Sequence, residues 1–280
     1  MPTSAMWFVW DAGLVVTLMG IGCMLGSVLG CIYNVSQWIG PSPLCIPLVA
    51  ILISLAVMTA TAHWFTMTTN PGVIPKEAHI HPFDPEAEEN GLKSPRDLEL
   101  VYCEPCDRKY PKRAEHCHTC NGCVVLLDHH CPWVNNCIGI NNAKNFILML
   151  LYISMTCFYM ITLTVVQVLT CTSQCGFKGD THPGRVGVWV LAISSLFFLL
   201  CAIMFIMEMY SIAEDEAYGA IAAQLSLDQE SREHESKFRQ RLGVLFGSDR
   251  FGWHWLIPGR DVHRRRRNAE MGLILGYHDD

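Results

Sequence analysis

Residues Asn34–Pro43 read NVSQWIGPSP and interrupt the longest apolar run of the chain. Between Ala12 and Pro75 there is no Lys, Arg, Asp or Glu. Such a run is not the core of a soluble domain, and it is too long for one crossing of a hydrocarbon layer about 30 Å thick. The glycine, prolines and polar residues of NVSQWIGPSP mark a turn. The run therefore predicts two membrane spans, Leu14–Ile32 and Leu44–Phe65.

The composition of the whole chain agrees with a membrane protein. Charged residues make up 16% of the 280 positions and hydrophobic residues 51%, whereas a soluble domain carries about 25% charged residues. Two further apolar stretches, Phe146–Leu169 and Val186–Met207, are long enough to span. We therefore expect an all-α polytopic membrane protein with four transmembrane helices.

Lysine and arginine predict the orientation, because they accumulate on the cytosolic side. Residues 1–75 hold none, residues 76–144 hold eight, 170–185 hold two and 210–280 hold ten. The middle loop and the tail are therefore expected in the cytosol, and four spans return the N-terminus there too. The expected parts are spans one and two (1–65), a cytosolic linker and cysteine-rich domain (66–145), spans three and four (146–209) and a cytosolic tail (210–280).

Seven of the 14 cysteines lie between Cys103 and Cys137, in CEPCDRKYPKRAEHCHTCNGCVVLLDHHCPWVNNC. In a reducing compartment such a cluster indicates metal binding or catalysis rather than disulfides. Pairs spaced Cys-x2-Cys are typical of zinc sites, which take four N or S ligands each. A block this short also needs a metal or a similar constraint to fold. Two zinc ions need eight ligands, and six cysteines with two histidines supply them, which leaves one cysteine over.

Other readings of the block remain open at this point. A single four-cysteine site would leave three thiols unused. A RING-type domain also uses eight ligands on two zinc ions, but it has no need of a spare cysteine beside Asp-His-His. A phosphatase reading of His130-Cys131-x5 fails, because that chemistry needs arginine at position 137, which is Cys137.

The block resembles the cysteine-rich domain of the DHHC protein S-acyltransferases, or palmitoyltransferases. The resemblance covers Cys103–Phe146 and includes the repeated Cys-x2-Cys pairs, Asp128-His129-His130-Cys131 and the later Asn142-x3-Phe146. Four spans with this block before the third span also match the family. Asn70-Pro71-Gly72 is similar to the family's Asp-Pro-Gly motif, with asparagine in place of aspartate.

The resemblance implies two structural zinc ions in interleaved sites. One site would use Cys103, Cys106, His116 and Cys123, and the other Cys117, Cys120, His130 and Cys137. It also implies that Cys131 is the nucleophile, with His129 and Asp128 as its partners. A free thiol is mostly protonated at neutral pH. An adjacent imidazole can take that proton, and a carboxylate can hold the imidazole in the right tautomer.

The implied reaction moves a fatty acyl group from acyl-CoA (palmitoyl-CoA) through acyl-Cys131 to cysteines of membrane-associated proteins. Arg113, with Arg108, Lys109 and Lys112, could meet the CoA phosphates, although a solvated basic face explains these residues equally well. An acyl chain that descends half the bilayer would end about ten residues into the third span, near Thr156. Packing against another helix is the alternative role of Thr156.

Some features depart from the family or have no assigned role. The family's Thr-Thr-x-Glu motif is missing after the fourth span, where Ser211-x2-Glu214 is the nearest match. An amphipathic helix is expected around Ala217–Leu242, and Arg241–Gly247 is similar to the family's C-terminal aromatic motif. Cys171 could pair with Cys175, and the RRRR run at 264–267 could attract anionic lipid.

The missing motif leaves a second hypothesis open, a zinc-folded membrane adaptor without transferase activity. Both hypotheses place the chain in a lipid bilayer, and neither includes a nucleic acid partner. The resemblance suggests the endomembrane system, with the Golgi as the first expectation.

Overall fold

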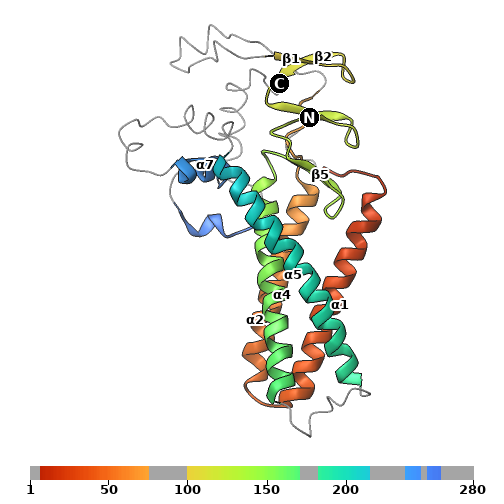
Figure 1. The fold of residues 1–280 in the computed structure, drawn as a ribbon, viewed down its shortest axis with the longest axis vertical. Coiled ribbons are helices and arrows are strands. Elements are labelled where there is room, and N and C mark those ends of the chain that lie inside the picture. The colour runs from red at the N-terminus through yellow and green to blue at the C-terminus, as the bar shows by residue number, and fades with distance from the viewer. Residues whose placement is uncertain (1–6, 76–99, 171–181, 215–236, 247–250, 260–280) are drawn as a thin grey trace.

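The computed structural model describes residues 7–75, 100–170, 182–214, 237–246 and 251–259. Its body is a bundle of long helices with a column of short β-hairpins at one end (Figure 1). Four of its helices are long and apolar enough to cross a membrane. They are α1 (Gly13–Ile39), α2 (Cys45–Thr68), α4 (Ala143–Thr170) and α5 (His182–Glu214). Each of the four predicted spans corresponds to one of these helices. All four helices continue past the end of the predicted segment, and α2 begins one residue after its start.

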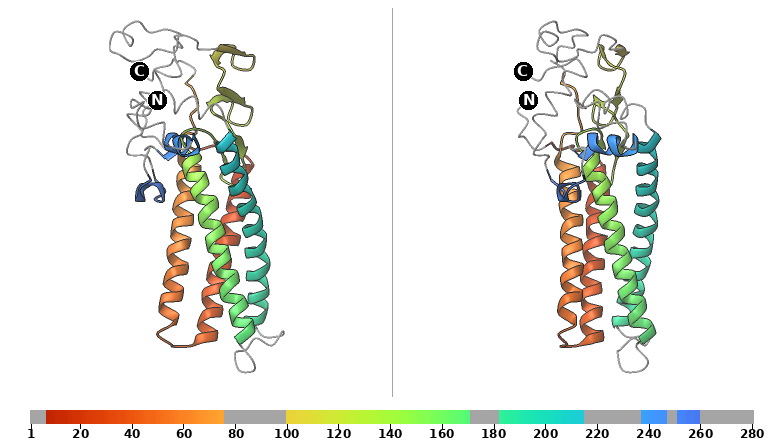
Figure 2. Two further views of the ribbon diagram at one scale, coloured as in Figure 1. Left: turned by 60° about the vertical axis from the view of Figure 1, so that its left-hand side comes forward. Right: turned by 90° about the vertical axis from the view of Figure 1, so that its left-hand side faces the viewer.

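Helix α4 is the centre of the bundle and contacts α1, α2 and α5. In the most apolar 18-residue stretch of α4, 61% of the residues are buried, against 22% in the corresponding stretch of α1, 17% in α2 and 11% in α5. Polar bonds join the helices far from the hairpins: Gln167 Nε2 donates to the Asn34 carbonyl at 3.2 Å, and the Tyr159 hydroxyl to the Leu48 carbonyl at 3.1 Å. Figure 2 shows the four helices running side by side.

The cysteine-rich block is built of β-hairpins, so the all-α expectation is wrong for this part of the chain. Three two-stranded antiparallel sheets follow one another. They are β1 (Leu100–Cys103) with β2 (Arg108–Pro111), β3 (Ala114–Cys117) with β4 (Gly122–Val125), and β5 (His129–Cys131) with β6 (Asn136–Ile138). Each turn contains a residue with φ near +50°, namely Asp107, Asn121 and Asn135. Asp and Asn tolerate this left-handed conformation better than most residues do.

The segment after α2 joins the bundle to the hairpins. Asn70 Oδ1 accepts the backbone N–H groups of Gly72 and Val73, both at 2.9 Å, which closes a turn. The chain then runs beside β4, where the Ile74 N–H donates to the Cys123 carbonyl at 2.9 Å. Asn70 supplies the acceptor oxygen that an aspartate would supply, so its departure from the family motif preserves the turn.

The described part of the tail packs on the start of α4. Helix α7 (Lys237–Phe246) is followed by a short 3-10 helix, η2 (Trp253–Trp255). The ring of Phe246 stacks on that of Trp255, with 4.7 Å between the ring centroids. Lys144 Nζ donates to the His254 carbonyl at 2.9 Å.

Several expectations for the tail and loops lie outside the described residues. These are Cys171, Cys175, the arginine run 264–267 and most of the expected helix Ala217–Leu242, of which α7 overlaps the end.

Candidate active site and metal centres

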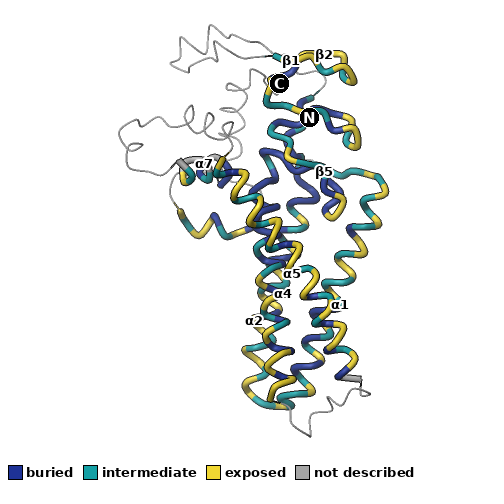
Figure 3. Tube along the Cα trace, in the orientation of Figure 1, coloured by how far each residue is buried: buried dark blue, intermediate teal, exposed yellow. Residues whose placement is uncertain are grey.

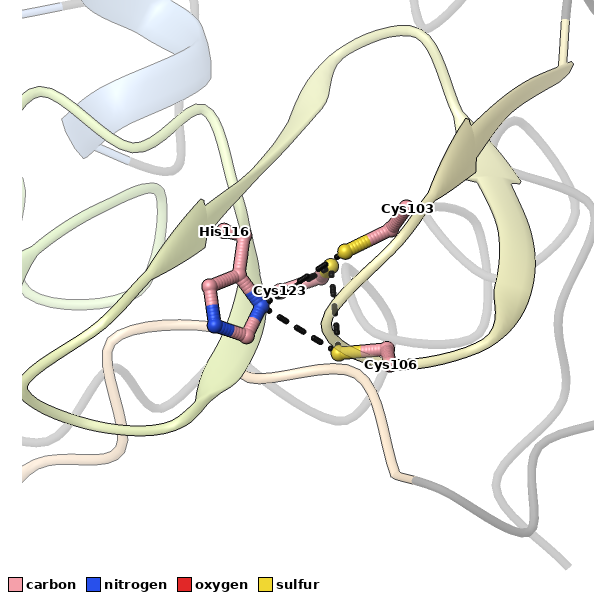
Figure 4. A group of neighbouring side chains, drawn as sticks. All are labelled: Cys103, Cys106, His116 and Cys123. Carbon is pink, nitrogen blue, oxygen red and sulfur yellow. Dashed lines mark hydrogen bonds between the residues drawn. The ribbon is translucent and has the colours of Figure 1, made fainter.

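The first metal cluster joins two hairpins. Cys103 and Cys106 come from the β1–β2 hairpin, and His116 and Cys123 face each other across β3 and β4. Their ligand atoms lie within 4.8 Å of one another. His116 Nδ1 is 3.6, 3.2 and 3.9 Å from the sulfurs of Cys103, Cys106 and Cys123 (Figure 4). Tetrahedral zinc with Zn–S and Zn–N bonds of usual length separates its ligands by about 3.5–3.8 Å. The donors and their spacing therefore fit zinc.

The second metal cluster repeats this arrangement one hairpin later. It consists of Cys117 and Cys120 from the β3–β4 turn, with His130 and Cys137 across β5 and β6. His130 Nδ1 is 3.8 Å from the Cys117 sulfur and 3.5 Å from the sulfurs of Cys120 and Cys137. The structure thus brings the eight expected ligands into two groups of three sulfurs and one imidazole, and both groups could hold zinc.

The three hairpins share one register, and this register explains why the block contains a cysteine, Cys131, that is not a metal ligand. Cys103, Cys117 and Cys131 are evenly spaced along the chain, and each ends the first strand of its hairpin. Three residues further on stand Cys106, Cys120 and Val134.

In the first two hairpins, the two turn cysteines combine with a histidine and a cysteine of the following hairpin. After the third hairpin the chain enters α4 instead. Its turn offers one sulfur, that of Cys131, because Val134 replaces the second cysteine. Cys131 therefore stands where the other hairpins place a ligand, but lies outside both metal clusters.

Cys131 lies beside a histidine–carboxylate pair. His129 Nδ1 is 2.6 Å from Asp128 Oδ2, and the His129 ring packs edge-on against Phe146 at 5.4 Å between centroids. The pairing with Asp128 is the main cause that raises the pKa of His129 to about 10, and the interaction with Cys131 adds to it. The same pairing with His129 lowers the pKa of Asp128. The three side chains form a chain from carboxylate to imidazole to thiol, with the thiol buried.

Contacts from the helices fix the segment that carries Cys131. Asn136 Nδ2 donates to three carbonyls at the end of α2, those of Thr66, Met67 and Thr69, at 3.0, 3.2 and 2.9 Å. The Thr17 hydroxyl of α1 donates to the Pro132 carbonyl at 3.0 Å, and His63 Nε2 of α2 lies 3.0 Å from the Trp133 carbonyl. The third hairpin is therefore held directly against the ends of two membrane helices.

Glu208 is a member of this site that the sequence analysis did not identify. It lies on α5, and its carboxylate is within 4.8 Å of the ligand atoms of Asp128 and His129. Its position in the sequence could have identified it, because Glu208 is the first acidic residue after the apolar run of the fourth span. The expected match Ser211-x2-Glu214 is only partly at the site: Ser211 lines the cavity described next, and Glu214 ends α5.

A cavity of about 280 Å³ opens beside Asp128. Asp128 and Glu208 share it with two basic residues, Lys112 and Arg113, and apolar side chains such as Ile147 complete its wall. Arg113 therefore lines the same cavity as Asp128. Arg108 and Lys109 are exposed on β2, in the hairpin of the first metal cluster.

Thr156 lies deep in the bundle, at the interface of α4 with α2. It is fully buried, and its hydroxyl is 3.1 Å from that of Thr59 while donating to the Tyr152 carbonyl at 2.7 Å. The structure thus shows Thr156 packed against α2. Its role in limiting acyl length stays a prediction.

Comparison with known proteins identifies the cysteine-rich block and the helices that follow it. Residues 97–219 match the family model described as DHHC palmitoyltransferase. Over these residues the chain is similar to a DHHC palmitoyltransferase domain. The matched region contains both metal clusters, Asp128, His129, Cys131 and the Glu208 contact.

Curated relatives are similar to the chain over a larger part of its length. Palmitoyltransferase ZDHHC7 of Rattus norvegicus is 34% identical over 167 residues, which are 58% of this chain and 52% of the relative. Palmitoyltransferase ZDHHC3 of Homo sapiens is 29% identical over 229 residues, 77% and 72% of the two chains. Probable protein S-acyltransferase 15 of Arabidopsis thaliana is 30% identical over 168 residues, 59% and 61%. The alignments with the most similar of these relatives span about half of their length.

Proposed function

We propose that this chain is a protein S-acyltransferase that transfers a fatty acyl group from acyl-CoA to cysteines of membrane-associated proteins. One observation carries the proposal: Cys131 occupies a ligand-type position outside both metal clusters and follows His129 on the same strand, and His129 is itself paired with Asp128. Such a chain of thiol, imidazole and carboxylate activates a sulfur nucleophile. The DHHC domain and the curated palmitoyltransferases support the assignment.

In the first step, His129 takes the proton of the Cys131 thiol, and the thiolate attacks the carbonyl carbon of the acyl-CoA thioester. The bond between that carbon and the CoA sulfur breaks, and His129 returns its proton to the CoA thiolate. Asp128 holds the His129 ring through Nδ1 and stabilises the imidazolium that forms. The products are acyl-Cys131 and free CoA.

In the second step, His129 takes the proton of a cysteine thiol of the protein substrate, and the resulting thiolate attacks the acyl-Cys131 carbonyl. The bond between that carbon and the Cys131 sulfur breaks, and His129 returns the proton to the Cys131 thiolate. Each step replaces one thioester with another, so neither is strongly uphill. The third hairpin meets the ends of α1 and α2 (Figure 3), where buried residues are dense. An acyl chain attached at this place can lie among the apolar helices.

Lys112 and Arg113 are proposed to bind the CoA phosphates. They are the two basic residues that line the cavity containing Asp128. Arg113 can offer two parallel N–H donors to one phosphate group, which is the geometry that favours arginine at such sites.

The two metal clusters are proposed to hold structural zinc. Each already supplies four protein donors, so zinc bound there has no open position for a substrate and would stabilise the hairpins. His130 precedes Cys131 in β5, so its place in the second cluster fixes the backbone of the nucleophile.

The lysine and arginine distribution supports a cytosolic hairpin block and cytosolic termini. This orientation gives the site access to acyl-CoA and to cytosolic cysteines of membrane proteins. We place the chain in the endomembrane system, and the Golgi stays the first prediction.

The proposal is tested against the adaptor hypothesis by incubating purified full-length chain with palmitoyl-CoA and a membrane-anchored peptide that contains one cysteine. A transferase releases one CoA thiol for each acyl group that reaches the peptide, and Cys131→Ser abolishes both. Absence of CoA release and of peptide acylation in the folded, metal-loaded chain would favour the adaptor.

A further inference from the structure

The segment that leads into α1 crosses the hairpin of the nucleophile. Trp7 Nε1 donates to Asn136 Oδ1 at 3.1 Å, and the Trp7 N–H donates to the Thr68 carbonyl at 3.1 Å. Asn135 Nδ2 donates to the Val9 carbonyl. These contacts place residues 7–12 across β6 and the end of α2.

Asp11 lies at the end of this segment, and its two carboxylate oxygens have different partners. Oδ1 accepts the backbone N–H of Gly13 at 2.9 Å, which fixes the side chain at the start of α1. Oδ2 lies 3.6 Å from Nε2 of His130. The Asp11 carboxylate therefore connects the start of α1 to the second metal cluster.

The other nitrogen of His130 faces the sulfurs. Nδ1 is within 3.8 Å of Cys117, Cys120 and Cys137. When Nδ1 donates its lone pair to a metal, the ring proton is on Nε2, the nitrogen that faces Asp11. A carboxylate in that position fixes the tautomer and orientation of a ligating histidine and raises its basicity.

Close packing keeps Asp11 in this place. A Cβ atom on Gly13 would lie 2.5 Å from Asn135 Oδ1 and 2.9 Å from Asp11 Oδ1. The start of α1 thus approaches the third hairpin so closely that there is no room for a side chain at position 13. The Asp11–His130 contact is part of this fixed junction rather than a meeting of two long surface side chains.

We infer that Asp11 is a positioning residue for the second metal cluster: its carboxylate orients the His130 ring for metal binding. Because His130 and Cys131 are neighbours in β5, the same contact also steadies the nucleophile. The inference rests on the metal occupancy in the proposed function and does not depend on acyl transfer.

The test compares metal release from the two clusters of one protein. Asp11→Ser keeps a short oxygen that can accept the Gly13 N–H but lacks the second oxygen toward His130. Asp11→Asn offers one oxygen and one N–H2 group, so it cannot accept from both partners. The zinc-loaded full-length chains are mixed with excess chelator, and the release of each zinc ion is followed over time.

We expect zinc of the second cluster to be released about tenfold faster in both variants, the lower end of the effect of losing such a partner. Release from the first cluster stays unchanged and is the internal control. Glu104→Gln, which removes one exposed charge from the first hairpin, is the charge-matched control and should change neither rate.

Loading with ¹¹³Cd assigns the effect to a cluster independently of the rates. Each cluster has three sulfurs and one nitrogen and should give one resonance, assigned through coupling to His116 or His130. The Asp11 variants should shift only the resonance coupled to His130. Unchanged second-cluster release, equal acceleration at both clusters, or a wild-type chain that binds no metal at the second cluster would overturn the inference. If the Asp11 variants show the selective metal effect but the wild-type chain transfers no acyl group, the proposed function alone would be overturned.

Discussion

At Cys131 the third hairpin keeps the register of the first two but loses their second sulfur. The pairs Cys103–Arg108, Cys117–Gly122 and Cys131–Asn136 occupy equivalent positions in the three ladders. Val134 stands where Cys106 and Cys120 stand, and it is fully buried. Cys131, the proposed nucleophile, thus has the same backbone position as a ligand cysteine, but its turn lacks a second sulfur and no further hairpin follows among the described residues to complete a cluster.

Glu208 provides a prediction at the same scale. Its carboxylate lies within 4.8 Å of the Asp128 carboxylate, and a glutamine amide can donate to Asp128 from the same place. We expect Glu208→Ala to lower the kcat of acyl-enzyme formation by about tenfold, less than the ~10²–10⁴-fold contribution of a group that transfers the proton itself. KM for acyl-CoA should stay unchanged, because the role assigned to Glu208 is to orient Asp128.

Glu208→Gln is the matched control and should stay within about twofold of the wild type. Single-turnover kinetics over a range of palmitoyl-CoA concentrations separate kcat from KM. Equal losses in both variants, or an effect on KM alone, would contradict the positioning role.

At the scale of the elements, we expect the hairpins to depend on their metal ligands as well as on apolar packing. Their strands are three or four residues long, and short isolated hairpins are only marginally stable in water. The binding free energy of the metal therefore becomes folding free energy. Changing a ligand should unfold its hairpin, whereas changing the spare cysteine should not.

We accordingly expect His130→Ala and Cys137→Ala to lose metal and to lower the yield of folded protein, whereas Cys131→Ser retains two zinc ions per chain. Elemental analysis of purified protein, normalised to amino-acid content, measures the ratio. One zinc ion per chain in Cys131→Ser would contradict the assignment of the eight ligands.

Gly139 tests the junction between the hairpins and α2. A Cβ atom there would lie 2.6 Å from the Pro71 carbonyl oxygen and 2.8 Å from Val124. Backbone cannot move aside as a flexible side chain can, so Gly139→Ala should destabilise the protein by about 1–3 kcal/mol.

The matched control is Gly22→Ala in α1, where a Cβ atom meets nothing within 4 Å. Replacing glycine within a helix by alanine should be neutral or stabilise by about 0.5–1 kcal/mol. Thermal unfolding of both variants in detergent measures the difference. Equal Tm values for the two variants would contradict the close approach at Gly139.

The sequence predicts the spans and the metal-ligand types better than the strands and the remote contacts. Charge-free apolar runs identify the four helices, because the bilayer demands their length and composition. The hairpins lack the apolar alternation that indicates strands, since cysteine turns determine them. The spacing of the cysteines also does not reveal which hairpins share a metal; that pairing came from a family resemblance. Glu208 reaches Asp128 only through the packing of α5 beside the hairpins, which no local pattern encodes.

At the scale of the whole molecule, the site lies at one end of a bundle whose centre is α4. The third hairpin is bonded to α1 and α2, and Glu208 approaches from α5. The helices therefore meet near Cys131, and the proposed reaction would bring an acyl chain to this end of the bundle.

The depth of the acyl chain gives a prediction at this scale. Half of a 30 Å hydrocarbon layer corresponds to about ten residues of helix, which leads from Phe146 to Thr156. If an acyl chain ends near Thr156, Thr156→Phe shifts the preference among acyl-CoAs toward chains shorter than about 16 carbons. Competition between acyl-CoAs of different length measures the profile.

Thr162→Phe is the matched control, because Thr162 is on the same helix but exposed. It should leave the profile unchanged. An unaltered profile in Thr156→Phe, with expression equal to that of the wild type, would contradict the depth assigned to the acyl chain.

The acyl-enzyme itself tests the central claim most directly. Purified full-length chain is incubated with palmitoyl-CoA without a protein acceptor, then analysed by intact mass and by peptide mapping, with and without hydroxylamine. Acyl transfer through Cys131 predicts one palmitoyl group per chain, on the peptide that contains Cys131, removed by hydroxylamine and absent in Cys131→Ser with both zinc ions still bound. A thioester that forms equally in Cys131→Ser, or no thioester in the folded two-zinc wild type, would contradict it.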